Sequence, residues 1–243
     1  MENNYLYDTH CHLDLFKNQD DIIRDIEKSK IYTIAVTNLP LLFRKLHDNL
    51  SSKYIRPALG FHPELILQYK HHIPQMWDLL NEVRYIGEVG LDFKTGNEFK
   101  ELQVSFFKEL IERCNKLGNK ILTIHSRQSA SEITSIIGAS FNGKIIMHWY
   151  SGNKTTLKQA INNGYHFSIN YSMVKSNSGK ELIKMIPLER LLLESDAPFI
   201  KYKKEPFTPM DIKKIVKELS TLLSIDYNRM SAILWSNFKT LIK

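Results

Sequence analysis

Apolar, strand-like runs alternate with amphipathic stretches along this chain, and this alternation most constrains its fold. Each pair takes up roughly 30 residues, the size of a β-α unit. Helical periodicity marks Asp20–Ser29, Gln103–Leu117 and Ala130–Ile137. Eight strand-like runs can be recognised: Tyr5–Thr9, Tyr32–Thr37, Ile55–Gly60, Tyr85–Val89, Ile121–Ile124, Ile145–His148, Tyr165–Ile169 and Leu191–Glu194. Eight strands, each followed by a helix, predict an α/β protein with a (β/α)8 TIM barrel rather than an open sheet.

Length and composition predict one domain over residues 1–243. A chain of 243 residues with 43% hydrophobic content suits a single barrel, and no linker or second core is visible. Pro209 begins another amphipathic helix, and Tyr227–Ile242 predicts an extra C-terminal helix. No stretch approaches the ~18 apolar residues of a membrane span. Cys11 and Cys114 make no disulfide framework, so we expect a cytoplasmic protein. We also expect a monomer.

Residues that can bind metal stand where the strand-like runs end. His10 and His12 alternate along a strand and therefore share a face, whereas Cys11 points toward the helices and is the weaker candidate for a ligand. A buried imidazole or carboxylate is costly unless it is paired, and barrel strands end on one rim. The sequence thus predicts a divalent metal centre with six ligands: His10, His12, Glu88, His125, His148 and Asp196. A hydrogen-bonded histidine pair and helix-capping carboxylates are the alternatives.

Two further residues on the same rim are candidates for catalysis beside Glu88 and Asp196. His62 lies in Gly-x-His-Pro at the end of the third run, where it could contact a phosphate or the leaving group. Glu194 alternates with Asp196, so both side chains face inward, and Glu194 could support a ligand.

The charge balance favours an anionic partner. The formal net charge is +7, and a basic surface attracts polyanions such as nucleic acid; a solvated lysine-rich surface is the alternative. The densest cluster, Lys201, Lys203 and Lys204, follows Asp196 closely, so we predict that it binds substrate.

Three residues next to the predicted ligands are also candidate substrate contacts. Arg127 could grip a phosphate with two hydrogen bonds, or it could form a surface ion pair. Trp149 and Tyr150 could stack on bases, or they could be packing residues.

Six motifs occur in a series that resembles the TatD family of metal-dependent deoxyribonucleases, which have a TIM-barrel fold. They are DTHCHLD at 8–14, GFHP at 60–63, GEVGLDF at 87–93, IHSR at 124–127, HWYSG at 148–152 and LESDAP at 193–198. The resemblance implies two divalent ions (Mg²⁺, Mn²⁺ or Zn²⁺) on the six ligands named above, with Glu88 bridging them.

The chain also departs from the family pattern. Gln128 stands where the family usually has an aspartate, HWY replaces the usual HCF, and IKYKKEP at 200–206 replaces a loop resembling RGKxNEP. These departures bear on substrate choice more than on the metal site. The combination resembles the TatD-like nuclease of Qat anti-phage systems, which implies protein partners from a defence system.

We therefore expect a metal-dependent phosphodiesterase that acts on DNA. No base-reading motif is visible, so we expect trimming of single-stranded or free DNA ends rather than sequence-specific cutting. The alternatives are an amidohydrolase or small-phosphoester hydrolase on the same metal site, or a defence-complex subunit whose catalysis is secondary.

Overall fold

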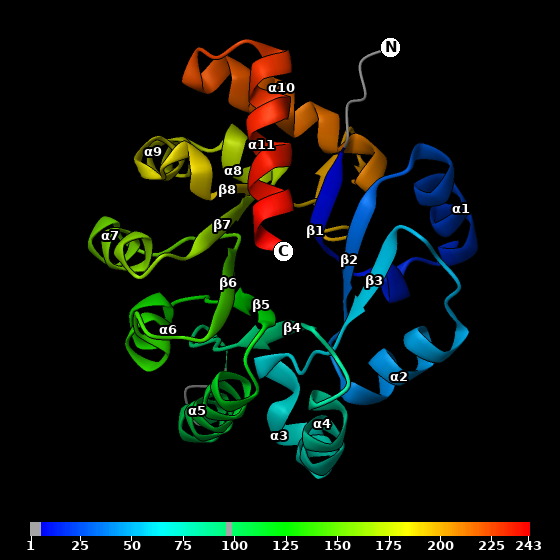
Figure 1. Cartoon of the computed structure of the whole chain (residues 1–243), viewed down its shortest axis with the longest axis vertical. Coiled ribbons are helices and arrows are strands. Elements are labelled where there is room, and N and C mark those ends of the chain that lie inside the picture. The colour runs from blue at the N-terminus through cyan, green and yellow to red at the C-terminus, as the bar shows by residue number, and fades with distance from the viewer. Residues whose placement is uncertain (1–5, 96–98) are drawn as a thin grey trace. The chain divides into compact units, whose positions relative to one another are not determined.

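The computed structural model describes residues 6–95 and 99–243, and the chain divides into two compact units. Unit 1 comprises the residues up to Ala35, Ser51–Arg56 and Phe167–Lys243; unit 2 comprises Val36–Leu50 and Pro57–His166. Tyr5, where we predicted the first strand to begin, lies outside the described residues. Along the chain, strands alternate with helices (Figure 1), as the sequence predicts.

Unit 1 contains two pairs of parallel strands. Strand β1 (Tyr7–Cys11) pairs with β2 (Tyr32–Val36), and β7 (His166–Ile169) pairs with β8 (Leu191–Leu193). Just beyond β8, a parallel bridge joins Ala197 to Cys11. The amide of Asp196 donates to the carbonyl of His10 over 2.9 Å. The residues that follow β8 therefore lie against the end of β1.

Unit 2 contains the end of β3 (Ile55–Ala58) and three further parallel strands. These are β4 (Tyr85–Gly90), β5 (Lys120–His125) and β6 (Gly143–His148). Strand β4 pairs with β5, β5 pairs with β6, and a parallel bridge connects Leu59 to Ile86. The predicted strands are confirmed to within a few residues at their ends.

Two glycines, Gly60 and Gly90, allow neighbouring backbone segments of unit 2 to lie close to one another. A Cβ atom on Gly60 would lie 1.6 Å from the carbonyl oxygen of Thr37 and 2.6 Å from the amide nitrogen of Glu88. Gly90 has a φ of 144°, and a Cβ there would lie 2.1 Å from the carbonyl oxygen of His125. No side chain fits at either position, so both glycines are needed to set the backbone that carries Glu88 and His125.

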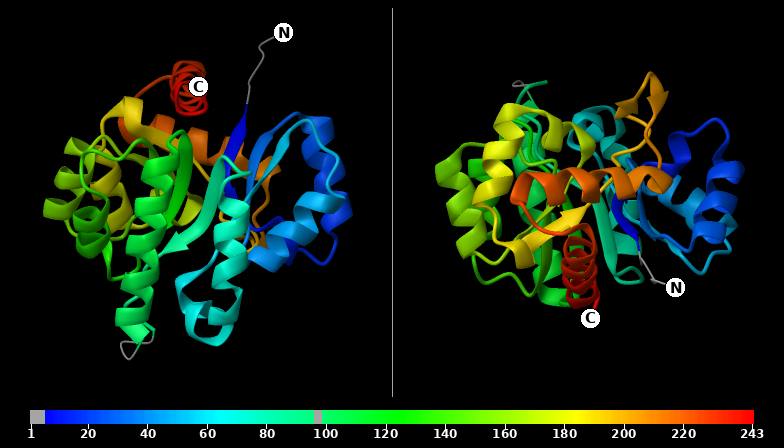
Figure 2. Two further views of the ribbon diagram at one scale, coloured as in Figure 1. Left: turned by 60° about the horizontal axis from the view of Figure 1, so that its bottom comes forward. Right: turned by 90° about the horizontal axis from the view of Figure 1, so that it is seen from above.

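Amphipathic helices cover the strands because each buries one apolar stripe. The apolar face of α11 packs on β1 in unit 1, where the Phe238 ring stacks on Tyr7 with ring centroids 4.2 Å apart. Figures 1 and 2 show α10 and α11 running in different directions. The helices of unit 1 are α1 (Gln19–Ser29), α8 (Tyr171–Lys175), α9 (Asn177–Met185), α10 (Ile212–Leu223) and α11 (Tyr227–Leu241). Those of unit 2 are α2 (Pro40–Asn49), α3 (Ile66–Tyr69), α4 (Ile73–Leu80), α5 (Lys100–Leu117), α6 (Ala130–Ile137) and α7 (Lys154–Asn162).

The extra C-terminal helix is confirmed as α11, and an unpredicted hairpin precedes α10. Strands β9 (Lys201–Tyr202) and β10 (Glu205–Pro206) pair in antiparallel fashion. Within the described ranges, every helix is too short or too polar to cross a bilayer.

Candidate metal centre and substrate site

The end of β1 presents two histidines to one carboxylate in unit 1. The Nε2 atoms of His10 and His12 lie 3.1 Å apart. Each lies 3.8 Å from Oδ1 of Asp196, and all three side chains are buried. This arrangement follows from the pleat, because alternate residues of a strand point to one face. The predicted His10, His12 and Asp196 therefore come together.

Asp8 links the backbone of β1 to the segment that follows β8 through hydrogen bonds. Its carboxylate accepts hydrogen bonds from the amides of His10 (3.0 Å) and Ser195 (2.9 Å). Burial raises the pKa of Asp8 to about 7, although these hydrogen bonds oppose the shift. Asp196 has a φ of 48°, a left-handed conformation that aspartate tolerates better than most residues do. Backbone hydrogen bonds on both sides of Asp196 thus fix the chain segment that carries its carboxylate.

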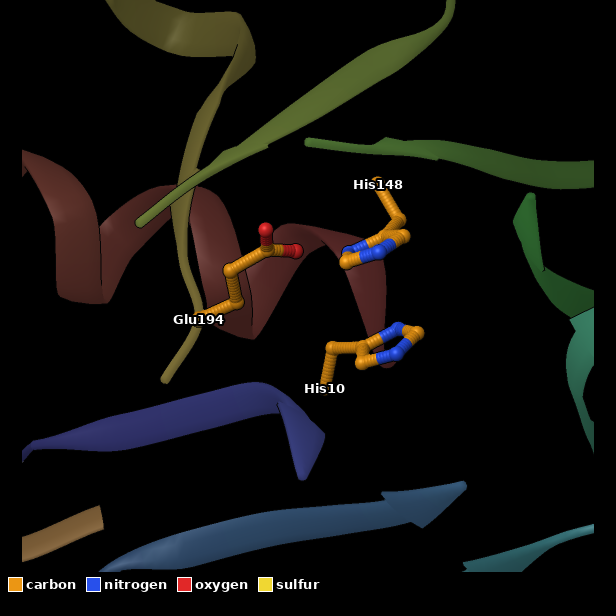
Figure 3. Close-up of side chains that lie close together, drawn as sticks. All are labelled: His10, His148 and Glu194. Carbon is orange, nitrogen blue, oxygen red and sulfur yellow. The ribbon is translucent and has the colours of Figure 1, made fainter. Parts of the chain in front are cut away.

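Glu194 is fully buried in unit 1, and neighbouring side chains hold both of its oxygens. The hydroxyl of Ser168 donates to Oε2, and Nδ2 of Asn170 donates to Oε1 over 2.9 Å. Figure 3 draws Glu194 and His10, which come from the segment after β8 and from β1. The carboxylate of Glu194 has a fixed orientation as a result.

A second ligand set forms around Glu88 in unit 2. Oε1 of Glu88 lies 2.7 Å from Nδ1 of His125, 3.5 Å from Nε2 of His62 and 3.7 Å from Nε2 of His148. His148, also labelled in Figure 3, ends β6. The sequence prediction placed His62 beside the ligands, and the structure groups it with Glu88 and His125 as a set that can hold a metal ion.

Asp92 contacts the ring nitrogen of His125 that faces away from Glu88. Asp92 was not predicted from the sequence as a site residue. Oδ2 of Asp92 lies 2.8 Å from Nε2 of His125. Burial alone would raise the pKa of Asp92, but the bond and charge of His125, with the amides of Lys94 and Thr95, lower it to about 2. Burial alone would lower the pKa of His125, yet Asp92 and Glu88 raise it to about 9. Alternation from Glu88 through Gly90 to Asp92 was the signal available in the sequence.

The donor atoms of both sets suit a divalent metal ion. Imidazole nitrogen and carboxylate oxygen are ordinary ligands of zinc and of other divalent metals. A carboxylate behind a ligand histidine, as Asp92 lies behind His125, is the usual support of such a ligand. Burial raises the pKa of the Cys11 thiol well above its ordinary value, which disfavours a thiolate ligand at that position.

The predicted substrate contacts that follow β5 and β6 differ in their exposure to solvent. Trp149 is 38% exposed, whereas Tyr150 is only 1% exposed and its hydroxyl donates to the carbonyl of Asn153 over 2.8 Å. Of the two alternatives for Tyr150, base stacking and packing, the structure supports packing, because its ring lies in the core. Arg127 is half-exposed, with Nη1 3.8 Å from Asp92.

The hairpin and a preceding aromatic residue expose further groups in unit 1. Lys201, Lys203 and Lys204 are all exposed on the β9–β10 hairpin. Phe199 is 59% exposed, and its ring meets the His12 ring edge-on with centroids 5.0 Å apart. Phe199 was not predicted from the sequence, where its position three residues after Asp196 is the one signal for it.

Comparison with known proteins decides the family. The sequence profile of the TatD related DNase family matches residues 7–243, almost the whole chain. The chain belongs to the TatD family. It is 26% identical over 254 residues to YabD of Bacillus subtilis, an uncharacterized metal-dependent hydrolase, covering 98% of this chain and 99% of that protein. It is 28% identical over 223 residues to human deoxyribonuclease TATDN3, covering 82% and 80% of the two chains.

The fold is that of solved TatD structures. The crystal structure of the Escherichia coli TatD homologue YJJV superposes with a TM-score of 0.85 at 20% identity, covering 97% of both chains. An Entamoeba histolytica TatD family hydrolase superposes with a TM-score of 0.78 over 98% of this chain. These similarities confirm the predicted (β/α)8 barrel. The chain is thus a TatD family enzyme, from a family of metal-dependent hydrolases, with a histidine and glutamate cluster that can hold a metal ion.

Proposed function

We propose that this protein is a metal-dependent deoxyribonuclease that hydrolyses phosphodiester bonds with two divalent ions. The observation that carries the proposal is the convergence of three histidine nitrogens, from His62, His125 and His148, within 3.7 Å of one oxygen of Glu88. Six residues would hold the ions, with Glu88 shared between them: His10, His12, Glu88, His125, His148 and Asp196.

The remaining residues of the site have separate roles in this proposal. Divalent ions, when bound, polarise a phosphoryl oxygen and lower the pKa of a water. Asp196 would accept a hydrogen bond from the attacking water and so orient it. The side chain of His62 is 13% exposed beside Glu88, so one ring edge can donate a proton to the leaving oxygen. Glu194, held by Ser168 and Asn170, would keep a carboxyl group of fixed orientation near His10 in unit 1.

DNA is the proposed substrate, and free single-stranded ends are the proposed form. The human relative is named a deoxyribonuclease, and the chain carries exposed cations in Arg127 and the hairpin lysines. Phosphate contacts by lysine and arginine bind nucleic acid without regard to sequence. Exposed Trp149 and Phe199 offer faces on which a terminal base can stack.

We further propose that the protein works as a monomer in the cytoplasm, as part of an anti-phage defence system with protein partners. The divergent Gln128 and the lysine hairpin support a specialised branch of the family, and both cysteines are unpaired. Phage plating on cells that carry the complete system should show protection that Asp196→Ala removes. Equal protection by the variant would contradict a catalytic role in defence.

A substrate panel tests the proposed activity. Purified protein is incubated with labelled single-stranded and double-stranded DNA, with RNA, and with small phosphoesters, carboxylic esters and amides, across Mg²⁺, Mn²⁺ and Zn²⁺. We expect hydrolysis of single-stranded DNA to be fastest and to stop with EDTA. Faster turnover of an amide or small ester than of any nucleic acid would assign the same site to a different hydrolase class.

A further inference from the structure

A cavity of about 480 Å³ opens in unit 2 beside the segments that follow β5 and β6. Its lining comes from three places: Lys94 after β4, Ser126 and Arg127 after β5, and Ser151 and Asn153 after β6. The first two residues of α6, Ala130 and Ser131, also line it. Among the residues that the structure describes, those that line the cavity include no acidic residue.

The two cations of this cavity are incompletely paired. Arg127 has one acidic neighbour among the described residues, Asp92, at 3.8 Å, which is too long for a hydrogen bond. The ammonium of Lys94 forms no ion pair with any residue in 6–95 or 99–243. Asp92 itself is already engaged by His125 and by the amides of Lys94 and Thr95. The described residues therefore leave the positive charge of Arg127 and Lys94 without full compensation at the cavity.

Hydrogen-bond donors of the cavity are also unused. Ser126 is 5% exposed, and its hydroxyl bonds to no residue of the described chain. Ser129 occupies the N-cap position of α6 but donates its hydroxyl to the carbonyl of Leu91 over 2.6 Å, so it does not cap the helix. The first amides of α6 consequently keep their donor capacity, and a helix N-terminus favours an anion. Glu132, the acidic residue of that first turn, does not line the cavity.

We propose that this cavity binds a phosphate group of the DNA strand, the backbone phosphate next to the one that is cleaved. The bidentate guanidinium of Arg127, the ammonium of Lys94, the hydroxyl of Ser126 and the α6 amides match the oxygens of a phosphodiester. Two of these residues follow the candidate ligand His125 directly in sequence, which places the cavity next to the Glu88 ligand set. The assignment rests on the proposed nuclease function and adds a second phosphate contact to it.

The test asks whether removing one charge from the protein and removing one charge from the DNA strand affect the same interaction. Binding of single-stranded oligonucleotides is measured in EDTA, where no cleavage occurs, with one phosphate at a time replaced by a neutral methylphosphonate. For the wild type we expect one position near the end to lose about tenfold in affinity, the value of a charged hydrogen bond. In Arg127→Gln, the same replacement should cost less than about twofold, because both changes act on the same interaction. Ser126→Ala should show a smaller coupling at the same position.

Lys144→Gln is the matched control, because it removes one positive charge, as Arg127→Gln does. Lys144 is exposed and lies at the opposite end of β6 from His148. This variant should retain the full methylphosphonate effect. Equal effects in wild type and Arg127→Gln at every position would overturn the assignment. Weaker binding of inorganic phosphate by Arg127→Gln with no coupling to any strand position would also overturn it, in favour of a free phosphate ligand. Because nothing is cleaved in this assay, its result is separate from that of the substrate panel.

Discussion

His125 lies between two carboxylates, and this arrangement decides how its ring is oriented. Nδ1 faces Glu88 at 2.7 Å, and Nε2 faces Asp92 at 2.8 Å. The bond to Asp92 leaves Nδ1 as the nitrogen that can serve as a ligand on the Glu88 side. A ligand histidine with a fixed ring loses less freedom on binding metal than a mobile one.

Replacing Asp92 by Asn should weaken metal binding and DNA cleavage by about 10- to 100-fold, the usual effect of removing a carboxylate behind a ligand histidine. Metal affinity by calorimetry and kcat/KM on single-stranded DNA measure the effect. Asp78→Asn on the exposed side of α4 is the control and should match the wild type. Unchanged metal affinity in Asp92→Asn would show that Asp92 does not position His125.

At the scale of elements, regular helices were easier to predict than turns. Ala130–Ile137 was predicted with the observed bounds, and α5 begins at Lys100 rather than at Gln103. The β9–β10 hairpin was missed because its two loop residues, Lys203 and Lys204, have φ values of 50° and 74°. Such turns normally carry Asn-Gly, and two lysines give no turn signal.

The hairpin lysines should contribute to DNA binding through charge alone. Replacing Lys201, Lys203 and Lys204 together by Gln should weaken binding at low salt and flatten the dependence of log Kd on log salt. The slope should fall by about 0.7 for each phosphate of a single strand that the variant no longer neutralises. Binding titrations across a salt series measure this.

The control for the hairpin variant carries the same reduction in charge elsewhere. Three exposed helical lysines replaced by Gln serve this purpose: Lys45, Lys108 and Lys184. This control should keep a slope near that of the wild type. If both triple variants flatten the slope equally, net charge and not the hairpin accounts for the effect.

Glu27 of α1 stabilises the approach to β3 and gives unit 1 a pH dependence. Its carboxylate accepts bonds from the Ser52 hydroxyl and from the amides of Lys53 (3.0 Å) and Tyr54 (3.3 Å), and the Ser52 bond, the largest effect, lowers the pKa of Glu27. A carboxyl group whose pKa is lower in the folded state than in the unfolded state stabilises the fold at pH values above its unfolded-state pKa. This stabilisation is lost as the pH falls through the folded-state pKa. Glu27→Gln should lower the free energy of unfolding at pH 7 by about 1 kcal/mol.

Denaturant titrations of wild type and Glu27→Gln at pH 7 and in the acidic range check this expectation. The difference between the two proteins should shrink as the pH falls below the ordinary glutamate range. A difference that stays constant down to the acid transition would mean that the charge of Glu27 is not what stabilises this contact.

At the scale of the whole molecule, the fold was predictable because eight apolar runs alternate with amphipathic stretches, and five of these runs end in residues that can bind metal. Within each unit, the structure brings the predicted ligands together, as the alternation of strand residues requires. Asp92 was missed because its partner His125 lies on the neighbouring strand, and one sequence does not show strand register. The sequence left stacking and packing open for Tyr150, because burial of an aromatic ring near a strand end depends on loop packing, here by Asn153.

End dependence is the property that separates trimming from internal cutting. On end-labelled linear and closed circular single strands of equal sequence, we expect the linear form to disappear at least tenfold faster, because only a free end can reach a buried ligand set. Gel time courses at equal concentration measure both rates. Degradation of the circle at the rate of the linear strand would contradict exonucleolytic action.

The proposed function requires that the buried histidines and carboxylates hydrolyse DNA with bound metal. The most direct measurement compares cleavage of labelled single-stranded DNA by wild type, His125→Ala and Asp196→Ala, each loaded with Mn²⁺, with circular dichroism to confirm folding. We predict metal-dependent cleavage by the wild type and a loss of at least about 10³-fold in both folded variants, since removing a ligand empties a metal site. Cleavage by either folded variant at the wild-type rate would show that the substituted residue does not hold a metal ion needed for DNA cleavage.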